Sequence, residues 1–559
     1  MKSLINYIFL TLFTIALSQD ETQIFKVNYE QFDNGVKRDT GHYIVYQNQI
    51  VSLSESDEKI QQYVDLKNKE NISTIMQDEK LFKNVVLFDT MPIPSFEDRT
   101  EIILGYNCKY ASYLYFSNTI EVWYTDETIA KGSPYSLFLP DINALVLKIV
   151  INNNRQSVVS SIEIIDEYPP PTYISNEAQE TTKAEFEEIK INSRFTRLPI
   201  FTDEIINFDN SLKPPEDETL VENVTYHFSK GSVILKKISL SQDLMDSGHV
   251  YAKLNCQSNG DAYDRTGSVF IIPDSEEVSL LDAYQHGLEQ IPVYIDNLDN
   301  KYQGIKREIN YEPPVEILRF FTSFGVNHFN EERKINNYEW EDDIIYKHDV
   351  SSLMPSDDPD IWIGVFIGNY DGGGHRVSLE LNFYPSFDES ESDKSNKYIQ
   401  SLFSTINTLE MSGQNYGKLF NNDTLAVDFE IPENVEELQL LFTSTGHGGW
   451  GGGDEFNPRL NQIFIDGKEI FKIVPWRTDC ATYRLSNPAS GNFSNGLSSS
   501  DFSRSNWCPG TLTSPFVVPL TELQSGKHTI EVIIDQGEDE GGSFNHWGVS
   551  GILTGKISN

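Results

Sequence analysis

Three short segments of the chain combine acids, aromatic rings and arginine in a way that suits chemistry on a sugar. Glu455-Phe456 follows Asp454 directly after the glycine-rich run 446–453. Segment 501–510 holds Arg504 and Trp507, and segment 261–265 ends in Tyr263-Asp264-Arg265. Aromatic rings stack on sugar faces, while carboxylates bind hydroxyl groups and transfer protons. Taken singly, each segment equally fits a solvated loop or a surface ion pair, so the hypothesis depends on the three together.

Several other chemistries have no motif in this chain. There is no Gly-x-Ser-x-Gly elbow, no His-Glu-x-x-His helix and no phosphate-binding loop, and the ten histidines include no His-x-His pair. The glycine run follows no βαβ pattern, so it is interpreted as a loop between strands. We therefore predict neither a metal nor a cofactor.

The charge of the chain limits its partners. Asp and Glu number 84 against 43 Lys and Arg, which leaves a net charge of −41 on 559 residues. Nucleic acids and anionic membranes attract basic surfaces, so neither is an expected partner. The acids are expected mainly to keep a soluble, monomeric chain dispersed, and they also suit an acidic endolysosomal compartment.

The first residues predict export. A short positive start and the apolar run 8–17 are typical of a secretory signal, here 1–18, and imply a secreted or lumenal protein. Four sequons fit that route, and the expected attachment sites are Asn71, Asn223, Asn422 and Asn492. In an oxidising compartment Cys480 and Cys508 could form a disulfide, whereas Cys108 and Cys256 either pair or stay free.

The rest of the chain is predicted to be all β, in three domains. An accessory domain spans 19–165, and the prolines at 169–171 begin a linker over 166–194. Val377, Leu379, Leu381 and Phe383 alternate with polar residues, as expected of an antiparallel sandwich over 195–388. After a charged linker at 389–395, Asp466-Gly467 predicts a hairpin within a second sandwich over 396–559. Both sandwiches are expected to be jelly rolls.

From Gly446 to Gly510 the chain resembles the C-terminal domain of the peptide-N-glycosidase F family. The resemblance rests on the Gly-His loop, Glu455-Phe456, Arg459 before a strand, Cys480, and the run from Arg504 through Trp507-Cys508 to Gly510. Tyr263-Asp264-Arg265 and the strand after it resemble the aromatic-Asp-Arg motif of the family's other domain. The resemblance covers about 195–559, and some members carry a further, bowl-like N-terminal domain.

The resemblance implies two eight-stranded sandwiches with a cleft between them and an amidase without cofactor. Such an enzyme cleaves the bond between N-acetylglucosamine and asparagine in N-glycoproteins, releasing a glycosylamine and leaving aspartate. Asp264 would be the base, Glu455 would act through the sugar, and Arg504 would bind near the substrate carbonyl. The implied substrate-binding residues are Arg265, Trp507, Phe456, Tyr370 and Asp371. A disulfide from Cys480 to Cys508 would hold the loop carrying Arg504.

One position departs from the family pattern. The family's second functional glutamate falls on Gly368 here, and Asp371 is the nearest acid along the chain. If no carboxylate takes that place, the alternative is a noncatalytic protein that binds N-glycans on the same scaffold.

Overall fold

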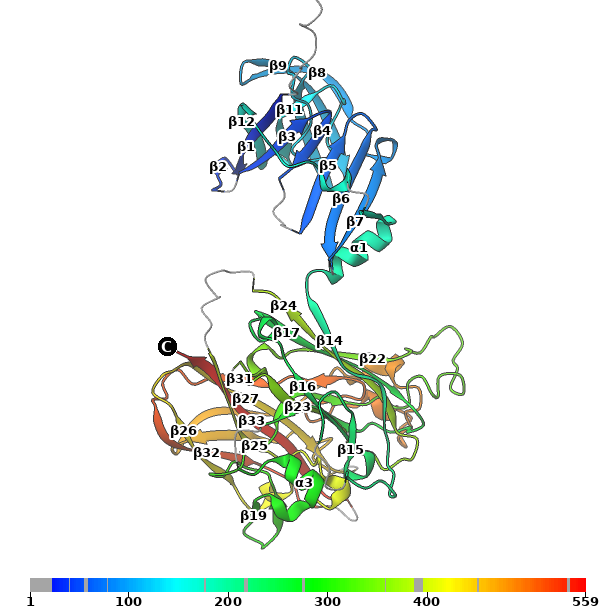
Figure 1. The fold of residues 1–559 in the computed structure, drawn as a ribbon. Helices are drawn as coiled ribbons and strands as arrows, with labels where there is room; N and C mark the ends of the chain where they lie inside the picture. Colours follow the sequence, from blue (N-terminus) through cyan, green and yellow to red (C-terminus); the bar gives the residue numbers. More distant parts are fainter. Residues whose placement is uncertain are drawn as a thin grey trace, which may run out of the picture. The chain divides into compact units, whose positions relative to one another are not determined.

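The computed structural model describes residues 23–39, 41–54, 59–77, 79–174, 177–215, 220–273, 277–356, 358–386, 396–449, 452–539 and 543–558. The predicted signal at 1–18 and the predicted linker at 389–395 lie outside these ranges. Within them, no helix has the length and apolar character needed to cross a membrane. The chain divides into two compact units, one ending at Arg194 and the other beginning at Phe195 (Figure 1).

The N-terminal unit is built on one long meandering sheet, in which strands that follow each other in the chain mostly pair antiparallel. Phe25, Val27 and Tyr29 on β1 are buried and alternate with polar residues, which is the period that a strand requires. The strands in sheet order are β13 (Gln179–Glu180), β7 (Lys80–Leu87), β6 (Glu70–Gln77), β5 (Ile60–Asp65), β4 (Ile50–Leu53), β3 (His42–Gln47), β1 (Ile24–Asp33), β12 (Arg155–Ile165), β11 (Leu145–Ile151), β10 (Asn118–Thr125), β9 (Tyr106–Tyr115) and β8 (Ser95–Ile103), with β2 (Val36–Lys37) paired to β1.

The segment 166–194 packs on this sheet, so its assignment as a linker was wrong. Helix α1 (Lys183–Asn192) begins with a capping box between Thr182 and Glu185, and it buries Phe186 against β5 and β6. The prolines keep the chain out of the ladder, but Tyr173 just beyond them donates to the Asp65 carboxylate at 3.2 Å. The short helices of the unit are η1 (Phe88–Thr90) and η2 (Thr172–Ile174).

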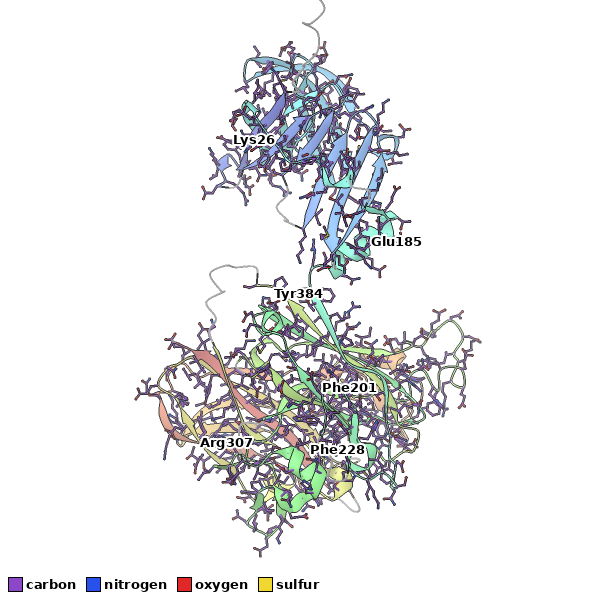
Figure 2. All side chains as sticks on the ribbon, in the orientation of Figure 1. Lys26, Glu185, Phe201, Phe228, Arg307 and Tyr384 are labelled. Carbon is purple, nitrogen blue, oxygen red and sulfur yellow. A yellow bond between two sulfur atoms is a disulfide. The ribbon has the colours of Figure 1, made fainter. Side chains whose placement is uncertain are left out.

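The second unit begins with a sandwich of a four-stranded and a six-stranded antiparallel sheet. Phe201 lies in the core between the sheets, and Phe228 packs in a neighbouring cluster (Figure 2). One sheet is β14 (Thr196–Ile206), β24 (His375–Tyr384), β17 (His249–Ser258) and β22 (Ile344–Asp349); the other is β15 (Tyr226–Phe228), β16 (Val233–Ser239), β23 (Asp360–Ile367), β18 (Thr266–Ile272), β21 (Val315–Phe321) and β30 (Leu512–Thr513). Its connections hold α2 (Gln242–Met245), α3 (Leu280–His286), η3 (Ser229–Gly231), η4 (Leu288–Gln290), η5 (Ser351–Leu353) and the hairpin β19 (Val293–Ile295) and β20 (Lys301–Gln303).

The second sandwich has two four-stranded antiparallel sheets, which gives the eight strands that the resemblance implies. One sheet is β25 (Asn396–Ser404), β33 (His546–Ile557), β27 (Val435–His447) and β31 (Phe516–Pro519); the other is β26 (Leu425–Ile431), β32 (Gly526–Ile534), β28 (Asn461–Ile465) and β29 (Lys468–Ile473). The short helices are η6 (Glu410–Ser412), η7 (Leu419–Asn421), η8 (Cys480–Ser486) and η9 (Ser499–Asp501). The first sandwich has ten strands in its two sheets, and one of them, β30, comes from the later half of the chain and pairs with β21.

The patterns that predicted β structure are confirmed at residue level. The Asp466-Gly467 turn joins β28 to β29, and both residues have the positive φ that a type I′ hairpin needs. The predicted apolar face of β24, from Val377 to Phe383, is at most 2% exposed. The all-β class with two adjacent sandwiches and an N-terminal β domain is therefore established.

A buried ion pair joins the two sandwiches. Arg319 on β21 binds both carboxylate oxygens of Glu316, at 2.6 and 2.7 Å. The same guanidinium donates across the seam to the Thr445 hydroxyl and to the Gly548 carbonyl, each at 3.0 Å. Because removing one partner would leave a buried charge unpaired, this pair fixes the register of the seam. The walls of the candidate site are built on that seam.

The predicted glycosylation sites differ in access. Asn223 and Asn492 are exposed, so they remain predictions. Asn71 is 8% exposed on β6, and its Nδ2, the atom a glycan would occupy, donates to the Ser136 carbonyl at 3.3 Å. The Nδ2 of Asn422 is also buried. Because these two nitrogens are covered or hydrogen-bonded in the folded protein, Asn71 and Asn422 are the less accessible of the four predicted sites.

Candidate functional site

A cavity of about 480 Å³ opens at the seam between the sandwiches. Its walls come from β18 and β23 of the first sandwich, from β27 and β33 of the second, and from the loops that follow them. The wall residues are Asp264, Arg265, Thr266, Phe366, Gly368, Tyr370, Thr405, Ile406, Asn407, Glu410, Tyr416, His447, Gly448, Gly449, Glu455, Trp507, Ser543, Phe544, His546 and Gly548.

Asp264 and Arg265 reach the cavity from the short loop between β17 and β18. A buried carboxylate behind them, Asp261, accepts from Arg265 Nε at 2.7 Å and from its Nη2 at 3.3 Å. The backbone nitrogen of Arg265 also donates to the Thr322 hydroxyl at 2.7 Å. The loop is thus held at both ends, and Asp264 keeps a side chain that is 16% exposed toward the cavity.

Glu455 is placed by its neighbour Asp454, which is fully buried. The Asp454 carboxylate accepts from Arg459 Nε at 2.7 Å and from the Trp547 indole at 2.9 Å. These bonds fix the end of the glycine-rich loop. The next side chain, Glu455, then lies in the cavity wall with 20% of its surface exposed. Of the two adjacent acids, one is therefore structural and the other is available for chemistry.

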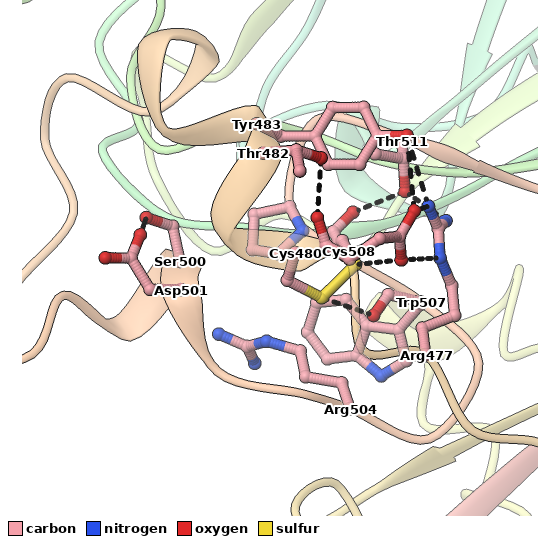
Figure 3. Close-up of a disulfide and its surroundings, with 12 residues drawn as sticks. Arg477, Cys480, Thr482, Tyr483, Ser500, Asp501, Arg504, Trp507, Cys508 and Thr511 are labelled. Carbon is pink, nitrogen blue, oxygen red and sulfur yellow. Dashed lines mark hydrogen bonds and ion pairs between the residues drawn. A yellow bond between two sulfur atoms is a disulfide. The ribbon is translucent and has the colours of Figure 1, made fainter.

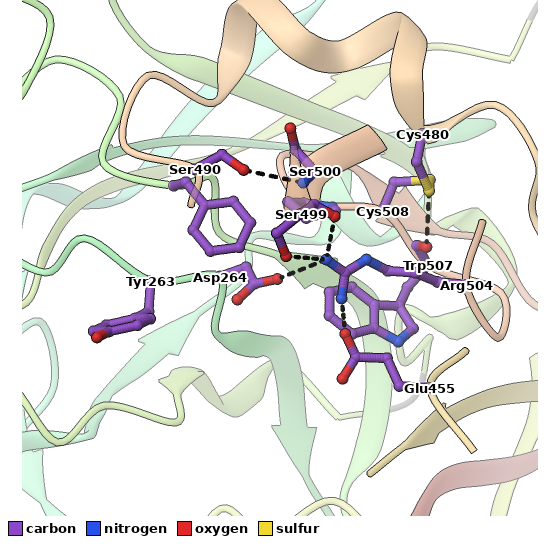
Figure 4. Close-up of polar contacts among 12 residues, drawn as sticks. Tyr263, Asp264, Glu455, Cys480, Ser490, Ser499, Ser500, Arg504, Trp507 and Cys508 are labelled. Carbon is purple, nitrogen blue, oxygen red and sulfur yellow. Dashed lines mark hydrogen bonds and ion pairs between the residues drawn. A yellow bond between two sulfur atoms is a disulfide. The ribbon is translucent and has the colours of Figure 1, made fainter. Parts of the chain in front are cut away.

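Arg504 connects the two acids from behind the wall. Its guanidinium forms an ion pair with Glu455 and lies 3.5 Å from Asp264, as Figure 4 shows. Its Nη2 also donates to the Ser499 carbonyl at 2.8 Å. The Arg504 side chain is only 1% exposed and takes no part in the cavity wall. The expected direct contact between Arg504 and a substrate carbonyl is therefore not what this geometry supports.

Two aromatic rings contact that guanidinium. Its central carbon lies 4.4 Å from the Trp507 ring centre and 4.9 Å from that of Phe456. Trp507 also forms part of the wall and stacks on Phe321 at 4.3 Å. Phe456 instead packs edge-on against Phe493 and Phe502, outside the wall. Phe456 thus supports Arg504 and is not placed to contact a ligand, contrary to the prediction.

The predicted disulfide between Cys480 and Cys508 is present and fully buried (Figure 3). It lies directly after Trp507, and the backbones of Arg477 and Arg504 pair beside it through hydrogen bonds of 2.8 and 3.1 Å. The disulfide and this short bridge together hold the loop that carries Arg504 and Trp507. Cys108 and Cys256, whose pairing was left open, are both free and buried, each within its own unit.

Removing this disulfide should cost stability as well as function. For Cys480→Ala combined with Cys508→Ala, we expect the free energy of unfolding to fall by roughly 3–4 kcal/mol, because a cross-link over 28 residues restricts the unfolded chain. Urea unfolding of the variant and the parent measures this difference. The paired change Cys108→Ala and Cys256→Ala removes two thiols without a cross-link and is the control. A double variant at 480 and 508 as stable as the parent would contradict the account.

Burial shifts the pKa values of Asp264 and Arg504. Burial raises the pKa of Asp264 to about 6, against the opposing charge of Arg504. Burial also lowers the pKa of Arg504 to about 10, so that guanidinium still carries its charge at neutral pH. A carboxyl group with a pKa near neutrality is well matched to general acid–base work.

Glu410, on η6, lies beside Gly368, where the family has its second functional glutamate and this chain has no side chain. A Cβ built on Gly368 would lie 3.1 Å from Glu410 Oε2. The same carboxylate accepts from the hydroxyl groups of Tyr370 and Tyr416, and burial raises its pKa while the Tyr370 bond lowers it. A carboxylate from another segment thus fills the space that a side chain at 368 would use. Sequence reasoning missed Glu410 because nothing near it resembles a motif.

Asp371 does not fill that place. Its carboxylate accepts from the backbone nitrogens of Gly373 and Gly374, at 2.7 and 3.3 Å, and it takes no part in the cavity wall. The side chain closes the glycine turn before β24. Its predicted role in substrate binding is therefore corrected to a structural one.

Two histidines that were not predicted also line the cavity. His447, within the glycine-rich run, is bonded through Nε2 to the Thr445 hydroxyl at 2.9 Å and stacks on His546 at 4.9 Å. Burial holds the pKa of His447 well below its usual range and lowers that of His546 to about 3. Both rings are therefore neutral at ordinary pH. The Gly-His pair in the sequence was the signal for His447.

One group in the described part of the chain has the spacing of metal ligands, namely Asp479 with Cys480 and Cys508. Both sulfur atoms belong to the disulfide, and Arg477 binds both carboxylate oxygens of Asp479 at 2.9 and 2.7 Å. Disulfide sulfur is not the thiolate that a metal needs. We infer no metal site from this group.

A two-sandwich fold with acids and aromatic rings lining a cavity, and a buried arginine behind them, defines a candidate carbohydrate-active protein. Three family models match the chain: "N-glycanase peptide, N-terminal domain" over 5–186, "Peptide-N-glycosidase F, N terminal" over 197–383, and "Peptide-N-glycosidase F, C terminal" over 415–554. No curated protein matches.

The two crystal forms of PNGF-II are similar to almost the whole chain. PNGF-II in its P21 crystal form is 36% identical, with a TM-score of 0.84, covering 96% of this chain and 100% of that one. PNGF-II in a C2 form is 37% identical, with a TM-score of 0.81, covering 96% and 99%. Recombinant peptide: N-glycanase F is 14% identical, with a TM-score of 0.43, covering 66% and 96%. The chain belongs to the peptide-N-glycosidase F family and carries the additional N-terminal domain.

Proposed function

We propose that the protein is an amidase that hydrolyses the bond between N-acetylglucosamine and asparagine in N-glycoproteins or glycopeptides. The products would be a glycosylamine and an aspartate in the peptide. The observation that carries the proposal is that Asp264 and Glu455 line one cavity and that both contact Arg504. The names of the matching family models support the choice of substrate.

An amide is a poor electrophile, so the reaction needs a base for water and donors for the charge that develops on oxygen. Asp264 is proposed as the base, since its pKa of about 6 leaves it ionised at neutral pH and still basic. Arg265 faces the same cavity and is the candidate donor to substrate. Glu455 is proposed to act through the sugar and an ordered water, with Trp507 as an apolar wall.

Arg504 is proposed as a positioning residue. Its guanidinium holds Asp264 and Glu455 on one side of the cavity, and its charge favours the ionised form of Asp264. The substrate then meets the two carboxylates and not the arginine. This role differs from the one that the family resemblance suggested, and it follows from the burial of Arg504.

Glu410 is proposed to supply the second functional carboxylate that Gly368 lacks. It faces the cavity together with Tyr370 and is the acid placed to bind a sugar hydroxyl there. The noncatalytic alternative was motivated by the absence of such a group, so the presence of Glu410 favours turnover.

Paired variants separate the two candidate acids. Glu410→Gln should lower kcat/KM roughly 10- to 100-fold, because a charged hydrogen bond contributes about 1.5–3 kcal/mol. Asp371→Asn is the matched control. Its kcat/KM should stay within about threefold of the parent value, because Asp371 lies outside the cavity and does not meet the substrate. Steady-state assays on one glycopeptide compare them. A strong loss with Asp371→Asn and none with Glu410→Gln would reverse the assignment.

The function itself is tested by incubating the purified chain with a denatured N-glycoprotein from pH 4 to 8. Free glycan and conversion of the linked asparagine to aspartate, both detected by mass spectrometry, are the expected result. Binding of the glycoprotein without that conversion would overturn the amidase proposal and leave the noncatalytic alternative.

A further inference from the structure

The N-terminal unit contains a hollow of its own, of about 220 Å³, on the sheet formed by β1, β12 and β11. Its lining includes one row of cross-strand neighbours, Gln31, Ser157 and Ile149, and part of the next row, Arg155 and Ile151, whose neighbour on β1 is Asp33. Tyr135 and Arg38 also contribute to its walls. The space is smaller than the ~300 Å³ at which pockets for drug-sized ligands begin, so it suits a single small ring.

The rim of the hollow carries excess positive charge. Arg38 forms an ion pair with Asp33, whereas Arg155 is exposed and forms no ion pair with any residue that the structure describes. Burial raises the pKa of Tyr135, and the charge of Arg155 opposes that effect, so the guanidinium lies near the phenol. The rim thus has two guanidinium groups and one carboxylate, a local positive charge in a protein whose net charge is −41.

The polar groups on the floor have a hydrogen-bond donor to spare. His42 is bonded through Nδ1 to the Gln31 amide at 2.6 Å and through Nε2 to the Ser157 hydroxyl at 2.9 Å. If the Gln31 amide nitrogen donates to His42, then His42 donates to Ser157, and the Ser157 proton has no acceptor. If the Gln31 oxygen accepts instead, its NH₂ group is left over. The spare donor thus belongs either to Ser157 or to Gln31, and both side chains line the hollow.

We propose that this hollow binds a carboxylate-bearing sugar, free or at the end of a glycan chain. Guanidinium groups match a carboxylate through paired hydrogen bonds, and the spare donor supplies a further one. Tyr135 and the isoleucines give an apolar surface for the ring. The choice of a sugar over other small acids rests on the proposed function, whereas the anion preference rests on the residues of the hollow alone.

The test measures direct binding to the purified full-length chain by saturation-transfer NMR and by calorimetry, so that hydrolysis plays no part. N-acetylneuraminic acid is the probe, and its methyl ester keeps the ring but removes the charge. A glycopeptide ending in that acid, the same glycopeptide without it, acetate and inorganic phosphate form the other arms. Arg155→Gln is the variant, and Arg99→Gln, an arginine on β8 outside the hollow, is the matched control.

We expect the acid to bind at least about tenfold more tightly than its ester, and Arg155→Gln to weaken it about as much, because one charged hydrogen bond accounts for that factor. Arg99→Gln should bind as the parent does. Acid and ester binding equally, or acetate and phosphate binding as tightly as the sugar acid, would overturn the proposal. If the glycoprotein assay shows no glycan hydrolysis while the sugar acid still binds here, the proposed function is refuted and this binding site is not.

Discussion

Asp264→Asn is expected to reduce kcat/KM by roughly 10²–10⁴-fold, which is the usual contribution of a general base. Asparagine keeps the size and the hydrogen-bonding oxygen that faces Arg504, but it cannot take a proton from water. The loss should therefore appear in kcat, with binding of the glycopeptide retained. Assays on a defined glycopeptide at pH 7.5, with binding measured separately, provide both quantities.

The fold of this variant should be at least as stable as that of the parent. Burial raises the pKa of Asp264 to about 6, above the ordinary value of 3.8 that the unfolded chain keeps. Ionisation of Asp264 therefore opposes folding as the pH rises from 3.8 to about 6, and the cost remains at higher pH. An uncharged side chain avoids this cost. Thermal unfolding at pH 7.5 is the check, and an unfolded or fully active Asp264→Asn protein would each contradict the assignment of the base.

Arg504→Gln is expected to have the second largest effect, roughly 10²-fold in kcat/KM at pH 7, by analogy with removal of a single electrostatic donor at other active sites. The charge of Arg504 lowers the pKa of Asp264, so its loss should move that pKa upward. The acid limb of the rate profile, which we expect near pH 6 in the parent, should shift to higher pH, and activity should partly recover as the pH is raised.

Two further variants show whether the effect is specific. Arg504→Lys keeps the charge without the paired geometry, so its acid limb should stay near that of the parent while its rate falls. Arg477→Gln removes a guanidinium that Asp479 binds outside the cavity, and it should change stability without moving the limb. An unshifted acid limb in Arg504→Gln would show that Arg504 supports the loop only.

The same pKa bears on the compartment expected from the net charge. A base that loses its proton near pH 6 is mostly inactive at lower pH, so the site itself gives no support to an acidic endolysosomal setting. The 84 acids are better explained as a charged surface, because few of them line the cavity.

Local patterns predicted the elements that depend on local physics. The β24 alternation and the Asp466-Gly467 hairpin were right because burial period and turn geometry are set by neighbouring residues. Asp264, Glu455 and Trp507 were chosen because each belongs to a short motif, and all three line the cavity. The prolines after 168 misled the domain assignment because they indicate only that the chain leaves the ladder. Whether it then packs on the sheet depends on tertiary contacts.

The sequence does not predict how deeply a side chain is buried or which residues from distant segments come together. Arg504 and Phe456 belong to the right motifs, but the sequence does not show that both lie behind the wall. Asp371 was chosen because it is close to Gly368 along the chain, whereas the carboxylate that approaches Gly368 in space is Glu410, on a different segment. Folding of the two sandwiches against each other, and not any motif, brings that acid to the site.

The central claim is that water attacks the asparagine amide carbon with Asp264 as the base. It is tested most directly by a single turnover of one glycopeptide in heavy-oxygen water, with the peptide product analysed by mass spectrometry. We predict one labelled oxygen in the new aspartate carboxyl group for each glycan released, and none with Asp264→Asn. Release of glycan with the asparagine unchanged, or with an unlabelled aspartate, would contradict the account.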